Sequence, residues 1–150
     1  MVEKKVKTFE NDVGSCIITT FRTSRTGSIF IRIKNSSSED DIHEFIGNCL
    51  RKVDYELDKI FIKVLIPNGV DFSIDGLEDF IEFVMEFPDI EIENEEEDGV
   101  RIITLRAFPK CQLIDIRNNG KYTEALFMVE SNYEAVEEDF VCYDEAKYLM

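Results

Sequence analysis

Apolar and polar positions alternate in the first part of the chain, as in β-strands. Residues 16–22 and 28–34 are rich in β-branched and aromatic residues, and residues 24–27 between them form a turn signal. A loop of those four residues predicts a hairpin in which Arg22 pairs with Ile29 and Ile18 with Ile33. The face assigned to the core carries Cys16, Ile18, Ile29, Ile31 and Ile33. The opposite face carries Ile17, Thr19, Phe21, Phe30, Arg32 and Lys34.

Two later segments have apolar residues at helical spacing. A run of serines at 36–38 and an acidic first turn precede the first helix, and the second starts at Asp75 or Gly76 and ends before Pro88. The inward positions of the first are Ile42, Phe45, Ile46, Cys49, Leu50 and Val53, and those of the second are Leu77, Phe80, Ile81, Val84 and Phe87. Between the helices, residues 60–66 predict a largely buried strand that ends at Pro67.

The second part of the chain predicts two more hairpins. Residues 90–93 and 100–108 flank an acidic turn at 94–98, and residues 112–117 and 121–128 flank the two-residue turn signal Asn119-Gly120. Residues 133–149 predict a closing helix, with 139–143 also compatible with a short edge strand. We therefore expect one α+β domain over residues 1–150, a mainly antiparallel sheet of hairpins with two or three helices packed on it.

Length and composition support a folded domain. The chain has 150 residues, of which 44% are hydrophobic and 33% charged. No apolar run reaches the roughly 18 residues that span a bilayer, and the first residues lack the apolar stretch of a signal peptide. The cysteines, at positions 16, 49, 111 and 142, have no metal-ligand spacing and are expected to be free thiols. These features predict a cytoplasmic protein with no membrane association.

Catalytic motifs are missing from the sequence. It contains no phosphate-binding glycine loop, no dinucleotide fingerprint, no zinc-protease motif and no nucleophile elbow. The single histidine, His43, follows two aspartates at a helix start, where a surface residue is expected rather than a catalytic base. We assign no catalytic residue, no metal and no cofactor, and expect a protein that is not an enzyme.

One carboxylate pair provides an alternative site. If Asn119-Gly120 is the turn, Asp115 lies directly opposite Glu124 and shares a face with Leu113, Arg117, Tyr122 and Leu126. Two adjacent carboxylates could bind a divalent cation or share a proton, which would make the chain a small metal-dependent enzyme or a ligand-binding domain. Arg117 offers the other interpretation, a solvated charge cluster.

A second alternative concerns Phe21, Phe30, Arg32 and Lys34 of the first hairpin. Aromatic and basic side chains on a sheet can stack bases and hold phosphates. The large negative charge of the chain argues against direct nucleic-acid binding, since phosphate contacts need a basic surface. We therefore expect Phe21 and Phe30 to lie beneath a helix.

Charge is the most unusual property of the sequence. The net charge is −15, and residues 64–150 hold six of the 17 basic and 22 of the 32 acidic residues. Glu78, Glu82 and Glu86 repeat every four residues along one helix, without an offsetting lysine. The acidic residues expected to contact a partner are Glu78, Asp79, Glu82, Glu86, Glu95, Glu96, Glu97 and Asp98.

This distribution predicts a protein that inhibits or escorts a basic partner, such as a nucleic-acid-binding protein or a nuclease toxin. In charge and size the chain is similar to small acidic immunity proteins and to phage-encoded DNA mimics. Solubility alone is the other explanation for the charge. A third hypothesis is a self-assembling homo-oligomeric subunit that buries part of its 12 Phe and five Tyr against its own copies.

Overall fold

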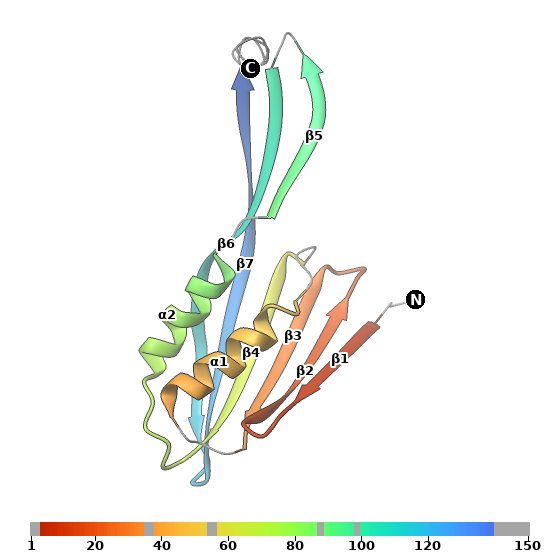
Figure 1. The fold of residues 1–150 in the computed structure, drawn as a ribbon. Helices are drawn as coiled ribbons and strands as arrows, with labels where there is room; N and C mark the ends of the chain where they lie inside the picture. The colour runs from red at the N-terminus through yellow and green to blue at the C-terminus, as the bar shows by residue number, and fades with distance from the viewer. Residues whose placement is uncertain (1–3, 35–37, 54–56, 87–88, 98–99, 140–150) are drawn as a thin grey trace.

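The computed structural model describes residues 4–34, 38–53, 57–86, 89–97 and 100–139, with the backbone alone for 89–97, 100–109 and 132–139. The fold is α+β: a mainly antiparallel sheet carries two helices, α1 (Glu39–Leu50) and α2 (Ile74–Met85), on one face (Figure 1). The strands are β1 (Lys4–Glu10), β2 (Gly14–Phe21), β3 (Thr26–Ile33), β4 (Lys59–Pro67), β5 (Asp89–Glu97), β6 (Val100–Asn118) and β7 (Tyr122–Asp139). Neither described helix is long and apolar enough to cross a membrane.

The strand order is β1-β2-β3-β4-β7-β6-β5. All neighbouring strands run antiparallel except β3 and β4, which are parallel and are connected through α1. A parallel pair needs such a crossover because a tight turn can only reverse the chain. The predicted packing of two helices on the sheet, with β4 between them in the chain, is confirmed, and both helices lie on one face of the sheet (Figure 1).

Both helices begin at the serines that the sequence offers. Ser38 accepts a hydrogen bond from the backbone N–H of Asp41, and Ser73 accepts one from that of Gly76. These serines satisfy N–H groups that have no acceptor inside the first turn of a helix. The apolar side of each helix then packs on the sheet, with Phe45 and Ile46 of α1 and Leu77 and Ile81 of α2 fully buried.

The first hairpin has the predicted faces but a different register. Ile18 pairs with Ile29 rather than with Ile33, and Phe21 pairs with Thr26, so the loop comprises residues 22–25. The two registers differ by four residues, an even number, and side chains alternate between faces with a period of two. The face assigned to the core is therefore confirmed: Cys16, Ile18, Ile29, Ile31 and Ile33 are all buried.

Strand β4 is buried on one side only, rather than through its whole width. Ile60, Ile62, Val64 and Ile66 face the helices and are buried, whereas Phe61 on the opposite side is 37% exposed. Both helices lie on one face of the sheet, so nothing from the described residues covers the other face of β1–β4 and the paired part of β7 (Figure 1). We call this uncovered surface the open face.

Two of the predicted strands are halves of one strand. β6 runs without a turn through residues 100–118, and its register against β7 shifts between Ala107 and Lys110. Pro109 lies in this shift, where the missing N–H of proline costs no ladder hydrogen bond. The two predicted strands are thus continuous, and residues 108–109 form an irregularity in their pairing with β7.

The predicted closing helix is wrong over residues 133–139. These residues continue β7, which pairs with β6 as far as Asp139 opposite Val100. Their conformation is determined by pairing with residues of β6 that lie 27 to 39 positions earlier in the chain. The spacing of Val136 and its neighbours does not reveal this pairing. The rest of that prediction, including the possible edge strand at 140–143, lies outside the described residues.

Beyond the end of β4, three strands continue as an extension of the sheet. β4 pairs with β7 only between Tyr122 and Glu130, whereas β5 pairs with residues 100–106 of β6, and these continue to pair with β7. Figure 1 shows these strand segments projecting past β4 and the helices. We call β5, residues 100–107 of β6 and residues 132–139 of β7 the arm.

Substitution of Gly14 tests the close packing where β2 meets α1. A Cβ atom at Gly14 would lie 2.5 Å from the carbonyl oxygen of Arg32 and 3.0 Å from Phe45 Cε1. Gly14→Ala is expected to lower the free energy of unfolding by about 1–3 kcal/mol because the backbone of β3 must shift. Urea denaturation measures this loss. The control Ser15→Ala, at the next residue of β2, is expected to stay within about 0.5 kcal/mol of the wild type, and equal losses would contradict the packing argument.

Candidate functional site

Helix α2 lies beside a part of β6 that, within the described residues, has no strand on its outer edge. β5 pairs with β6 only up to Arg106, so residues 110–118 of β6 have β7 on one side alone. The backbone N–H of Leu113 donates to Glu78 Oε2 at 2.9 Å, and that of Cys111 donates to Glu82 Oε2 at 3.4 Å. Two helix carboxylates therefore take the place of the missing strand as acceptors. Covering an open edge in this way prevents unwanted pairing with another strand.

The acidic residues of α2 consequently differ from one another in their surroundings. Glu78 and Glu82 are half-buried against β6, whereas Asp79 and Glu86 are exposed. The sequence predicted one outward acidic stripe, and the structure divides it. In the sequence, Glu78 and Glu82 stand out because they are four residues apart and have no lysine partner. That spacing does not reveal that the edge of β6 beside them is unpaired.

The predicted acidic turn is largely a strand. Glu95, Glu96 and Glu97 belong to β5, with Glu96 opposite Arg101 and Glu97 opposite Val100 after a bulge that follows Glu93. Asp98 lies outside the described residues. These glutamates thus extend the arm rather than forming a compact loop.

The topology collects acidic residues on the arm. Its three strand segments contain ten Asp or Glu residues and only two basic residues, Arg101 and Arg106. The acidic residues are Asp89, Glu91, Glu93, Glu95, Glu96, Glu97, Glu134, Glu137, Glu138 and Asp139. The register places Glu91 opposite Thr104 and Glu93 opposite Ile102, so neither of these glutamates has an arginine directly across from it.

The alternative site at the turn of β6 and β7 has a different register from the predicted one. Arg117 lies opposite Glu124, and Asp115 lies opposite Leu126, because Gly120 and Lys121 are the central residues of the turn. Gly120 has a φ of +91°, as the first central residue of a II′ hairpin turn requires. Leu113 pairs with Phe127 on the helix side, since a bulge at Ile114 separates it from the face of Asp115.

Both carboxylates of this alternative site have a cation beside them. Asp115 Oδ2 lies 2.7 Å from Arg117 Nε, and Glu124 Oε1 lies 3.2 Å from Lys63 Nζ. The described residues contain no group of three or more His, Cys, Asp or Glu side chains that could hold a metal ion. Each of the two carboxylates is thus ion-paired with a cation of the same surface.

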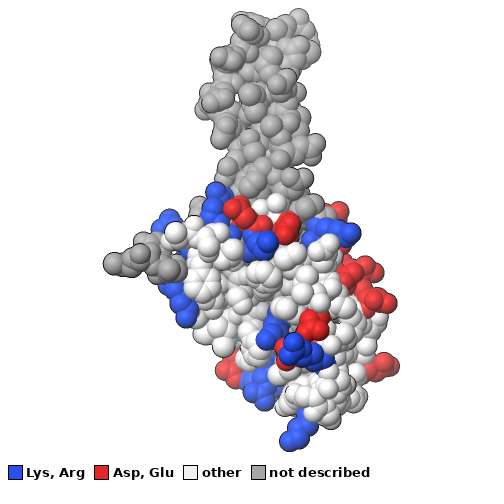
Figure 2. Space-filling view, turned by 180° about the vertical axis from the view of Figure 1, so that it is seen from behind, with Lys and Arg blue, Asp and Glu red and all other residues white. Residues whose placement is uncertain are grey.

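The open face carries the aromatic residues expected beneath a helix. Phe21 and Phe30 lie on the side of the sheet away from α1 and α2, so that expectation is wrong. Figure 2 shows this side, where uncharged residues occupy much of the surface. Arg32 donates to the hydroxyl of Tyr122 at 3.4 Å and its guanidinium carbon lies 5.8 Å from the centre of that ring.

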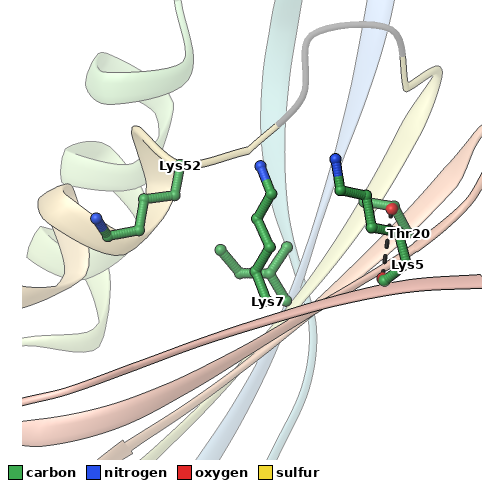
Figure 3. A pocket seen from close by; sticks show the side chains of 5 residues that line it. Lys5, Lys7, Thr20 and Lys52 are labelled. Atoms are coloured by element: carbon green, nitrogen blue, oxygen red, sulfur yellow. Dashed lines mark hydrogen bonds between the residues drawn. The ribbon is translucent and has the colours of Figure 1, made fainter.

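A small hollow lies between β1 and the end of α1 (Figure 3). Lys5, Lys7, Ile18, Thr20 and Lys52 line it. Lys52 Nζ lies 4.7 Å from the ring centre of Phe9. Figure 3 shows the amine of Lys52 directed away from those of Lys5 and Lys7, so the three cations do not converge on one point.

His43 and the described cysteines occupy positions between elements of the fold. The ring of His43 stacks on Phe80 of α2 at 4.6 Å, with its Nε2 3.8 Å from Glu39 Oε1. His43 is therefore a contact between the two helices rather than a plain surface residue. Cys16, Cys49 and Cys111 are buried free thiols. A hydrogen bond between Cys16 and Cys49 lowers the pKa of Cys16 and raises that of Cys49.

No match was found when the chain was compared with protein-family models, with curated proteins and with solved structures.

The role of Glu78 predicts a difference between two adjacent acidic residues of α2. Glu78→Ala leaves the part-buried N–H of Leu113 without an acceptor, and the free energy of unfolding is expected to fall by about 1–3 kcal/mol. Asp79→Ala, at the exposed neighbour, is expected to change it by less than about 0.5 kcal/mol. Chemical denaturation of both variants measures the difference. A loss for Glu78→Ala no larger than that for Asp79→Ala would show that Glu78 does not stabilise the edge.

Cys111 predicts a dependence of stability on pH. Burial, with smaller contributions from Glu78 and Glu82, raises the pKa of the Cys111 thiol from 9.0 to about 12. The unfolded chain therefore loses this proton at lower pH, and the free energy of unfolding falls as the pH rises from 9 to 12. Cys111→Ala is expected to make that fall shallower by up to about 1.4 kcal/mol per pH unit. Urea denaturation at several alkaline pH values measures both slopes, and identical slopes would refute the assignment.

Proposed function

We propose that this chain is a non-enzymatic binding protein whose acidic arm engages a basic protein partner. The observation that carries the proposal is the concentration of ten carboxylate residues and two arginines on three strand segments that extend past the helices (Figure 1). Such a surface attracts a basic partner over distances of about one Debye length, roughly 8 Å at physiological ionic strength.

The position of β5 supports a specific mode of contact. β5 is the last strand in the sheet order and, within the described residues, pairs only with β6. Its outer backbone N–H and C=O groups offer an edge to which a partner strand can add. Carboxylates along this edge disfavour pairing with a second copy, by like-charge repulsion, and favour a strand rich in Lys or Arg.

In the proposed mechanism, the carboxylates of the arm compete with nucleic-acid phosphates for the basic residues of the partner. Lys and Arg residues that bind nucleic acid would be occupied by carboxylates of the arm, so the bound partner could not use them on phosphates. We infer on this basis an inhibitor or escort of a nucleic-acid-binding protein or nuclease toxin, in the manner of an immunity protein or a DNA mimic. Asp79 and Glu86 of α2 are exposed and can add to the attraction.

Two further observations concern the proposed location of the protein and the alternative that it is an enzyme. The three described cysteines are free thiols, which fits the reducing cytoplasm that we propose as its location. The enzymatic alternative has less support, because Asp115 and Glu124 are each ion-paired with a cation of the same surface.

Reversal of two charges on β5 tests the proposal. The partner is first recovered by affinity capture at about 0.05 M salt and is expected to be depleted at about 0.5 M salt. Glu91→Lys combined with Glu93→Lys is then expected to slow association with this partner by about tenfold or more, with a smaller effect on dissociation. Surface plasmon resonance measures both rates.

The matched control reverses two exposed charges that are not on the arm. Glu44→Lys combined with Asp71→Lys changes the net charge by the same amount, and association is expected to slow by less than about threefold. Capture of no basic protein at either salt concentration would contradict the proposal. Equal effects of the two double variants would also contradict it, because only the net charge would then matter.

A further inference from the structure

The open face combines exposed apolar residues with strand pairing that places them together. Val6, Ile17 and Phe61 are 50%, 44% and 37% exposed. Ile17 lies directly opposite Phe30, and Phe61 lies directly opposite Met128, so these side chains form cross-strand pairs on one surface. A contiguous group of exposed apolar side chains on a sheet face marks an interaction surface.

Each carboxylate of the open face lies beside a lysine. Glu10 pairs with Lys34, Glu130 with Lys59, and Glu124 with Lys63. Arg32 on the same face lies against Tyr122, so, within the described residues, the surface has no unpaired carboxylate patch to attract a basic protein, although the whole chain carries −15. Two copies of a strongly acidic chain can approach each other at such a surface, because the arm, which carries much of the excess charge, extends beyond it (Figure 1).

The dimensions of the open face fit those of a dimer interface. Five strands at about 4.8 Å spacing and about seven residues per strand at about 3.3 Å cover roughly 550 Å² in projection. The relief of the side chains makes the accessible area larger, which brings it near the roughly 800 Å² that each partner buries in a standard interface. Two twisted sheets pack face to face at about 10 Å with their strands about 30° apart.

We propose that a second copy of this chain covers the open face, giving a symmetric dimer in which two sheets pack as a sandwich with the helices outside. The same surface then serves both copies, as a two-fold interface requires. Val6, Ile17, Phe30, Phe61 and Met128 supply its apolar centre, and the ion pairs lie around it. This inference does not depend on the proposed function of the arm.

Sedimentation velocity of the full chain over a range of concentrations tests the dimer. The wild type is expected to sediment with twice the mass of one chain at high concentration, with little dependence on salt. Phe61→Asp is expected to raise the dissociation constant by at least about tenfold, because a buried carboxylate at the centre of the interface would lack a partner. Ile17→Asp is a second variant of the same kind on a different strand.

Phe83→Asp is the matched control. Phe83 is 63% exposed but belongs to α2, on the other side of the sheet, so its variant is expected to dimerise like the wild type. Circular dichroism and urea denaturation establish that each variant is folded. A wild type that stays monomeric at all concentrations would overturn the inference. Weakening by Phe83→Asp equal to that by Phe61→Asp would overturn it as well.

Discussion

The constraint on which the rest of the structure depends is that β6 is paired along most of its length on one edge but only in part on the other. β6 has 19 residues, and on its outer edge β5 pairs only with the first part of it. The remaining edge would expose backbone donors, which in a stable sheet need an acceptor or water. Helix α2 supplies those acceptors through Glu78 and Glu82. The edge of β6 thus ties α2 to the sheet, in addition to the burial of Leu77 and Ile81.

This arrangement separates two uses of acidic residues that look alike in the sequence. Glu78 and Glu82 satisfy backbone groups within the chain, so their charge is partly committed to the fold. The arm lies beyond the helices and concentrates carboxylates on strands, one of which is at the edge of the sheet. By charge alone, the glutamates of α2 and the carboxylates of the arm were equal candidates for a partner surface. They differ in the structure because Glu78 and Glu82 accept backbone hydrogen bonds from β6, whereas the arm belongs to strands beyond the helices. The open face forms a third kind of surface, which carries exposed apolar residues and whose carboxylates are each paired with a lysine.

The sequence predicted faces better than it predicted registers. The faces of the first hairpin are right although the pairing is shifted by four residues, because an even shift keeps every side chain on its side. At Leu113 the same logic fails, since a bulge at Ile114 adds one residue and reverses the alternation. Bulges of this kind depend on the partner strand, so the spacing of residues within β6 does not reveal them.

The helices were predictable and the ends of long strands were not. A serine run before α1 and the apolar spacing of both helices are local signals, and they located α1 and α2 to within a few residues. The capping role of Ser73 before α2 was not predicted. Residues 133–139 have a spacing compatible with a helix, and only their distant pairing with β6 makes them a strand. The same limitation applied to the alternative site, because the one-residue displacement of the turn at Gly120 placed Arg117 rather than Asp115 opposite Glu124. The acidic character of the arm is visible in the sequence, but only the strand pairing shows that its three segments lie together.

Amide hydrogen exchange at Cys111 and Leu113 tests the central claim most directly. These two backbone N–H groups face an edge without a strand, and the account assigns them to carboxylate acceptors on α2. In the wild type they are expected to exchange as slowly as the amides of β7 that pair with β4, such as those of Phe127 and Val129. Exchange as fast as that of the turn residues Gly120 and Lys121 would contradict the claim that α2 closes the edge of β6.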